Sequence, residues 1–298
     1  MVRQYKIHTN LDGTGDKVWD VTNGKVRFYQ PSNLGLQSTN NIWQSNGIGV
    51  MGTRSITQPQ IEFKLETFGE SLEENYQLMK DFINDILNQK FVTLEYQTEI
   101  FQVYADLALA DVTKTEGYGK NGTFSEKITF DIITKWYTYE NLTFEKIQNG
   151  QVLSGKSKIY GGTAPGSYKY VEGISYTYYG ESDIDRLSRW DIKDEIFSFT
   201  GILYPQLPKT PTGVRFLDDI GNEYTAIVFK TEQAQDYILI NTDVNDETYQ
   251  GWNGTSSLNL FPVMDFERYR TRIIEKGQME LINLTKAEFK IKRKAEFI

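Results

Sequence analysis

The stretch EKITFDIITKWYTY, residues 126–139, decides how the chain divides. Its first half alternates apolar and polar side chains, which predicts a strand with Ile128, Phe130 and Ile132 on one face. It ends in an aromatic cluster that contains Trp136 and Tyr137. Before this stretch the pattern is of strands plus one strong helix, and after it almost only of strands and turns. We therefore expect one domain over residues 1–136 and a second over residues 137–298.

Composition agrees with two sheet-rich domains and excludes several kinds of site. A chain of 298 residues typically forms two domains, and its 19 Tyr and 17 Phe favour sheet. The net charge of −8 repels phosphate backbones, so we expect no nucleic-acid partner. The absence of cysteine excludes disulfides, thiolate metal sites and cysteine nucleophiles.

No stretch of the sequence predicts a membrane segment. The first ten residues, MVRQYKIHTN, lack the apolar core of a signal peptide. No apolar run approaches the roughly 20 residues of a membrane span. We therefore expect no membrane partner and no export by a signal peptide.

The first half reads as an antiparallel sheet with one packed helix. Ser71 and Glu74 form a capping box, and a helical apolar stripe follows that we expect to lie on the sheet: Leu72, Tyr76, Met79, Phe82, Ile83, Ile86 and Leu87. Asn23-Gly24 predicts a hairpin between two strands. The predicted strands are residues 3–8, 17–21, 25–29, 59–67, 91–96 and 101–111. This pattern predicts a β-rich α+β fold.

Residues 30–58 differ from the rest of the first half, because they are long, polar and rich in Gly, Asn and Ser. We expect little regular structure in them, which in a compact domain marks a functional or mobile segment. The segment either covers the core as an Ω-loop or orders against a neighbouring subunit with Trp43 as anchor. Both readings stay open. Apolar residues scattered through it include Leu34, Leu36, Ile42 and Trp43.

The second half has short strands at regular spacing, which indicates a β-sandwich or jelly roll. Asn149-Gly150 predicts a hairpin, and residues 251–254 predict a turn. The predicted strands are residues 190–203, 213–218, 224–230, 237–241, 258–261, 268–274, 279–284 and 288–292.

Residues 159–189 form a tyrosine-rich excursion within this half. Tyr, Gly and Ser together make an adaptable binding surface, so we favour a partner-binding segment slightly over a plain exposed hairpin. The tyrosines concerned are Tyr160, Tyr168, Tyr170, Tyr176, Tyr178 and Tyr179.

No motif for catalysis, cofactor binding or metal binding emerges. His8, the one histidine, has no Ser, Cys or Asp at a known catalytic spacing. Phosphate-binding loops and zinc-protease motifs are absent. We predict no catalytic residue, no cofactor and no metal site, and expect a structural or binding protein rather than an enzyme.

Over its whole length the chain closely resembles the distal tail proteins (Dit) of siphophages that infect lactococci. The most telling stretches are SLEENYQLMKDFINDILNQKF, ITFDIITKWYTYENLTFEKI, SYTYYGESDIDRLSRWDIKDEIFSF and FERYRTRIIEKGQMELINLTKAEFKIKRK. The resemblance implies an N-terminal belt domain that closes a homo-hexameric ring around a channel. It also implies a C-terminal galectin-like β-sandwich with an arm-like extension, which we place at about residues 145–189.

In this family the ring joins the tail tube protein above to the tail-tip protein below, and the arm grips trimers of receptor-binding protein. The resemblance therefore places the protein in the virion, at the distal end of the tail. We expect the ring interface to include Leu34, Leu36, Ile42 and Trp43, and the arm to use the six tyrosines. Trp136 and Tyr137 then fix the angle between the domains.

A carbohydrate-binding module that recognises a host surface saccharide is the alternative function. A galectin pocket uses a histidine, and the second half contains none. Trp190 and Trp252 remain possible stacking residues, although core or turn packing explains each of them better. Likeness of fold to lectins does not by itself indicate sugar binding.

Overall fold

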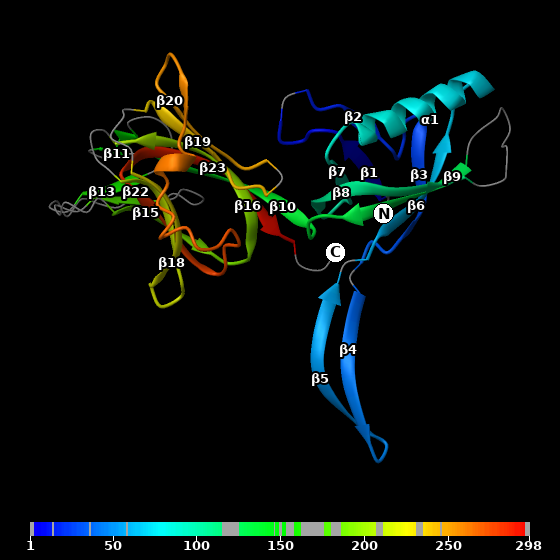
Figure 1. Cartoon of the computed structure of the whole chain (residues 1–298), viewed down its shortest axis with the longest axis horizontal. Helices are drawn as coiled ribbons and strands as arrows, with labels where there is room; N and C mark the ends of the chain where they lie inside the picture. Colours follow the sequence, from blue (N-terminus) through cyan, green and yellow to red (C-terminus); the bar gives the residue numbers. More distant parts are fainter. Residues whose placement is uncertain are drawn as a thin grey trace. The chain divides into compact units, whose positions relative to one another are not determined.

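The computed structural model describes residues 3–13, 15–35, 37–57, 59–114, 125–145, 147–148, 151–152, 158–161, 176–179, 186–206, 211–230, 235–244 and 246–295. The chain forms two compact units. Unit 1 comprises Met1–Thr138 and Ala295–Ile298, and unit 2 comprises Tyr139–Lys294. Strands dominate both units, and the predicted β-rich fold class is confirmed (Figure 1).

Unit 1 is built on an antiparallel sheet of seven described strands, in the order β2-β1-β7-β8-β9-β6-β3. In β6 the apolar residues Ile61, Phe63 and Leu65 are buried, while the alternate positions are only partly buried, so one face of the sheet carries the core. The strands are β1 (Gln4–His8), β2 (Val18–Asp20), β3 (Val26–Ser32), β6 (Ile61–Thr67), β7 (Val92–Gln97), β8 (Gln102–Thr113) and β9 (Ser125–Ile132).

Helix α1 (Leu72–Leu87) packs on this sheet and begins as predicted, because the Ser71 side chain accepts a hydrogen bond from the Glu74 amide at 3.1 Å. The predicted buried stripe is partly wrong. Phe82 and Ile86 are buried, but Leu72, Tyr76 and Leu87 are exposed. The helix is turned so that Asn75 faces inward, where its side chain accepts a hydrogen bond from the Gly69 amide at 2.6 Å.

The predicted hairpin at Asn23-Gly24 is wrong, because β2 pairs with β1 and β3 pairs with β6. The Asp20 side chain accepts hydrogen bonds from the amides of Thr22 and Asn23, and the Asp20 carbonyl accepts one from Gly24. This turn carries the chain between the two end strands of the sheet instead of pairing them as a ladder.

Unit 2 is a β-sandwich whose two sheets enclose a second apolar core. One sheet runs β10 (Tyr137–Glu145), β23 (Leu284–Lys294), β16 (Ile196–Pro205), β19 (Tyr237–Asn241), β20 (Thr248–Trp252) and β21 (Ser257–Asn259). The other runs β13 (Lys158–Gly161), β14 (Tyr176–Tyr179), β15 (Arg186–Ile192), β22 (Gly277–Ile282), β17 (Thr212–Leu217) and β18 (Glu223–Phe229). A separate pair, β11 (Ile147–Gln148) and β12 (Gln151–Val152), flanks the predicted turn at residues 149–150.

A single residue carries the chain from one sheet of the sandwich to the other between β22 and β23. Asn283 alone separates β22 from β23, and it does so with a positive φ of 50°. Its side-chain amide donates to the Pro211 carbonyl at 2.7 Å, which holds this corner. Gly213 is required where β17 meets β18, because a Cβ there would lie 2.0 Å from the Ile227 carbonyl oxygen.

Three local predictions in unit 2 are wrong. Residues 190–203 are not one strand, because the chain leaves β15 and enters β16 in the opposite sheet. Residues 268–274 form no strand; the Arg268 carbonyl instead accepts the Ala226 amide and so covers the edge of β18. Trp252 ends strand β20, and the turn lies beyond it.

The chain crosses between the units twice, after Thr138 and after Lys294. On the unit 1 side the two crossing points are adjacent, since the Ala295 amide donates to the Trp136 carbonyl at 2.8 Å. Within the described ranges, no helix has both the length and the apolar character needed to cross a membrane.

Candidate interaction surfaces

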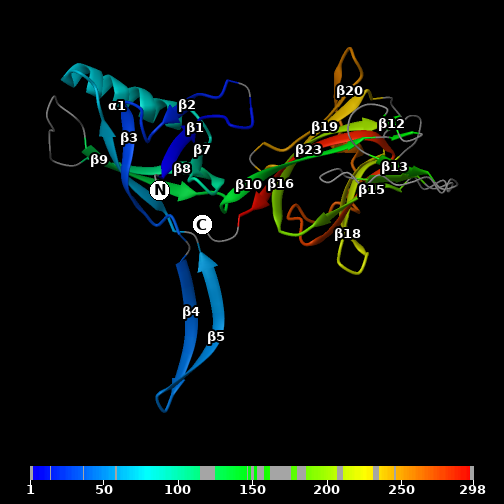
Figure 2. The ribbon, with the colours of Figure 1, turned by 180° about the vertical axis from the view of Figure 1, so that it is seen from behind.

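The segment predicted to lack regular structure contains a long β-hairpin, so that prediction is wrong. Strands β4 (Gln37–Ser45) and β5 (Ile48–Thr57) pair antiparallel in a sheet of their own. Asn46 and Gly47 form the turn, both with positive φ, as a type I′ hairpin requires. This Asn-Gly pair was the sequence signal for the hairpin. Figure 2 shows the hairpin standing away from the sheet of unit 1.

The hairpin carries exposed apolar side chains on both faces. Residues opposite each other in an antiparallel pair point to the same side. Trp43 and Val50 therefore share one face, and Ile42 and Met51 share the other. Trp43 is 68% exposed, and Gly52 leaves the room beside its indole. Because an isolated two-stranded hairpin is at best marginally stable in water, this one is suited to being covered by a partner.

The four predicted ring-interface residues are not in equivalent places. Ile42 and Trp43 are exposed on the hairpin. Leu34 is partly buried against the core of unit 1, and its carbonyl accepts a hydrogen bond from the Trp136 indole at 3.1 Å. Leu36 lies outside the described residues.

Trp136 and Tyr137, predicted to lie at the domain seam, are both buried in unit 1. The ring of Trp136 packs 5.9 Å from that of Tyr96. The Tyr137 hydroxyl donates to Asp106 at 2.7 Å, and its ring stacks on Tyr104. These contacts anchor the start of β10 to the first unit, and the predicted control of the inter-domain angle stays a prediction.

The tyrosine-rich excursion contributes strands to one sheet of the sandwich. Tyr160 lies in β13, and Tyr176, Tyr178 and Tyr179 lie in β14. Strands β13 and β14 run parallel, with Tyr160 opposite Tyr178, and they extend the sheet beyond β15. Tyr168 and Tyr170 lie outside the described residues.

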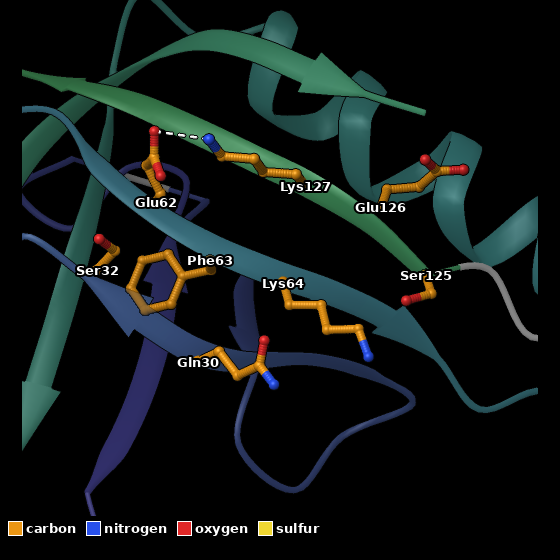
Figure 3. Close-up of a pocket in the computed structure, with 8 residues that line it drawn as sticks. All are labelled: Gln30, Ser32, Glu62, Phe63, Lys64, Ser125, Glu126 and Lys127. Carbon is orange, nitrogen blue, oxygen red and sulfur yellow. Dashed lines mark ion pairs between the residues drawn. The ribbon is translucent and has the colours of Figure 1, made fainter. Parts of the chain in front are cut away.

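A shallow groove of about 440 Å³ lies in unit 1, across β3, β6 and β9 (Figure 3). Its charged walls are internally paired. Lys127 bonds Glu62 at 2.8 Å, and Lys64 bonds Glu66 at 2.6 Å. Two serines are part of the lining, without a histidine among the lining residues. The groove therefore offers a polar surface on which Lys127 and Lys64 are paired with carboxylates. The lining residues are Gln30, Ser32, Glu62, Phe63, Lys64, Ser125, Glu126 and Lys127.

His8 has a structural role. It is buried, with Nδ1 2.7 Å from Asp16 and Nε2 2.8 Å from Glu95, and so ties β1 to β7. Burial raises the pKa of the Glu95 carboxyl, but hydrogen bonds from Lys6 and His8 outweigh it and hold that pKa below its ordinary value. Among the residues that the structure describes, no cluster of histidine and carboxylate side chains is suited to holding a metal ion.

The two tryptophans considered for sugar stacking are both partly buried. Trp190 packs against the sandwich core. Trp252 stacks on Tyr237 with ring centroids 6.4 Å apart. Packing within the sandwich accounts for both side chains.

Comparison with known families covers nearly the whole chain. Residues 4–133 match the model described as "Distal tail protein, N-terminal domain". Residues 135–298 match the model described as "Dit, C-terminal domain". The chain is 92% identical to the distal tail protein of Lactococcus phage p2 and 90% identical to that of Lactococcus phage SK1, in each case over all of both chains.

The chain is also similar to solved structures of distal tail proteins. A chain of the phage p2 baseplate in its activated conformation with Ca is 92% identical, and the two chains match over their full lengths with a TM-score of 0.79. The phage SPP1 Dit protein is 11% identical and has a TM-score of 0.53 over 98% of this chain and 99% of its own. The second match shows a shared fold.

Proposed function

The chain belongs to the distal tail protein (Dit) family, and we propose that it is a structural hub of a phage baseplate, at the distal end of the tail. The observation that carries this proposal is the 92% identity, over the full length of both, to a chain of the phage p2 baseplate. The protein is thus a virion component whose work is to hold other proteins, and no catalytic step is assigned to it.

Within that role, unit 1 forms the belt that closes a ring of six copies. The hairpin β4–β5 supports this proposal, because it presents Ile42 and Trp43 to solvent on opposite faces. A hairpin with two apolar faces is stabilised most when both faces are buried against neighbouring protein. Ring closure around a channel supplies such a place between neighbouring copies.

Variants of the hairpin test the ring. Wild-type protein should appear as a ring with a central hole by electron microscopy, and as a hexamer by native mass spectrometry. Ile42→Glu and Trp43→Glu each place a charge on one apolar face and should abolish the ring. Ile100→Glu adds the same charge at an isolated exposed position outside the hairpin and should leave the ring intact. A wild-type chain that stays monomeric at high concentration would exclude the ring.

The partners follow from the same role. We assign the tail tube protein and the tail-tip protein to the two sides of the ring, and trimers of receptor-binding protein to the tyrosine-rich arm of unit 2. Strands β13 and β14 support the arm assignment, because they prolong the sheet at its edge with Tyr160 and Tyr178 in register. Replacing residues 158–182 with a Gly-Ser linker should abolish capture of receptor-binding protein in a pull-down and spare the ring. Unchanged capture of receptor-binding protein would contradict the arm assignment.

A further inference from the structure

Exposed apolar side chains in the described part of unit 1 gather in two places. One is the hairpin, with Ile42, Trp43, Ile48, Val50 and Met51. The other is helix α1, with Leu72, Tyr76 and Leu87. Ile100 and Ile133 are also exposed, but they occur singly, which is ordinary for a protein surface. Contiguous exposed apolar surface, in contrast, marks an interaction site.

Three exposed apolar residues of α1 lie along one side of the helix and form a ridge. At 3.6 residues per turn, Leu72, Tyr76 and Leu87 fall within about 60° of one another around the helix axis. They are 56%, 61% and 62% exposed. The neighbouring arc of the helix, with Phe82 and Ile86, is buried on the sheet. The apolar face of α1 is therefore wider than the sheet beneath it can cover.

We propose that this ridge, Leu72, Tyr76 and Leu87, docks the hairpin β4–β5 of a second copy of this chain. The inference rests on the proposed ring and names the two surfaces that meet in it. A closed ring joins one face of each copy to a different face of the next, so unit 1 needs two unlike surfaces that fit each other. Among the described residues of unit 1, the hairpin and the ridge are the two surfaces that each expose three or more large apolar side chains.

Placement and charge agree with this pairing. Figures 1 and 2 both show α1 on the side of unit 1 opposite to the hairpin, as contacts that propagate around a ring require. Arg54 is the only charged residue between positions 37 and 57. Helix α1 carries four acidic residues and Lys80 as its only basic one, but Glu74 pairs with Lys25 and Asp85 pairs with Lys17. Glu73 and Asp81 remain as its negative charges towards a partner. The two surfaces therefore attract each other weakly and have no like-charge conflict.

Charge substitutions on the ridge of the full-length chain test the proposal. Leu72→Glu and Tyr76→Glu should each raise the concentration at which the ring dissociates at least tenfold, as measured by native mass spectrometry and light scattering. Asn84→Glu adds the same charge on the solvent side of α1, and Ile100→Glu replaces an isolated exposed apolar residue. Both controls should assemble like wild type. An unchanged thermal unfolding midpoint of the dissociated chain verifies that each variant folds.

A photo-crosslinker identifies the surface that meets the ridge. Benzoylphenylalanine at position 76 should yield a covalent dimer, with the attachment point between residues 37 and 57 of the second copy. Wild-type assembly by both ridge variants, or crosslinks to any other surface, would overturn the docking proposal and leave the ring standing. A wild-type chain that never assembles would remove the ring and the docking proposal together.

Discussion

Replacing Trp136 with alanine should destabilise unit 1 selectively. The side chain is only 6% exposed, packs against Tyr96 and donates its indole N–H to the Leu34 carbonyl. Burying a tryptophan removes roughly 150–250 Å² from water, worth about 4–6 kcal/mol at about 25 cal/mol per Å². The unfolded chain is compact and already buries part of this area, which reduces the hydrophobic loss. The Leu34 carbonyl loses its hydrogen-bond donor in the variant, which adds a cost of roughly 1 kcal/mol. We expect a net loss of about 4 kcal/mol.

Native-state hydrogen exchange with mass spectrometry measures this loss in each unit separately. A loss of about 4 kcal/mol accelerates the slowest amides of β7 and β8 about a thousandfold, at 1.36 kcal/mol per tenfold. Amides of β16 and β23 in unit 2 should keep their rates. Trp43→Ala, compared on dissociated chains, is the matched control, because there it removes the same side chain from an exposed position and should change stability by less than about 0.5 kcal/mol.

Two outcomes would refute this reasoning. Equal acceleration in both units would mean that the indole stabilises unit 2 as much as unit 1. A loss in unit 1 below about 1 kcal/mol would mean that the ring fills no essential part of that core. The second result would favour the role first predicted for Trp136, control of the inter-domain angle.

Three further predictions concern local features. The pKa of the Glu95 carboxyl in the folded protein lies below its ordinary value of 4.5. The ionised carboxylate therefore stabilises the fold fully above pH 4.5, and this stabilisation is lost as the pH falls through the lowered pKa. Urea midpoints at pH 7 and pH 3 should consequently differ less in Glu95→Gln than in wild type. Gly213→Ala should cost unit 2 more than about 2 kcal/mol through its clash with Ile227, whereas Gly35→Ala, with no atom within 4 Å, should be neutral in thermal unfolding. Ser71→Ala removes the α1 cap and should cost about 1 kcal/mol by urea denaturation, and an unchanged midpoint would contradict the capping role.

The sequence predicts the structure where local chemistry decides it. The alternation of Ile61, Phe63 and Leu65 predicts β6, because its two faces meet different surroundings. Ser71 and Glu74 predict the start of α1, because the cap is completed within four residues.

The wrong predictions share a physical cause: the partner of a strand and the coverage of a surface depend on residues far away in the sequence. The turn after Asp20 could be predicted, but the partner of β3 is β6, some 30 residues further on. The hairpin β4–β5 carries apolar residues on both faces, so the strand period of two is lost there. The α1 stripe predicts an apolar face without saying how much of it the sheet covers, which left the exposure of Tyr76 unforeseen.

The hydrogen bond between Ala295 and Trp136 has an evolutionary consequence. It brings the exit from unit 1 and the return to it together, so both ends of the sandwich attach at one place on unit 1. Insertions are best tolerated where the two ends of the host lie close together. Recombination can therefore exchange the sandwich as a unit without disturbing the fold that receives it.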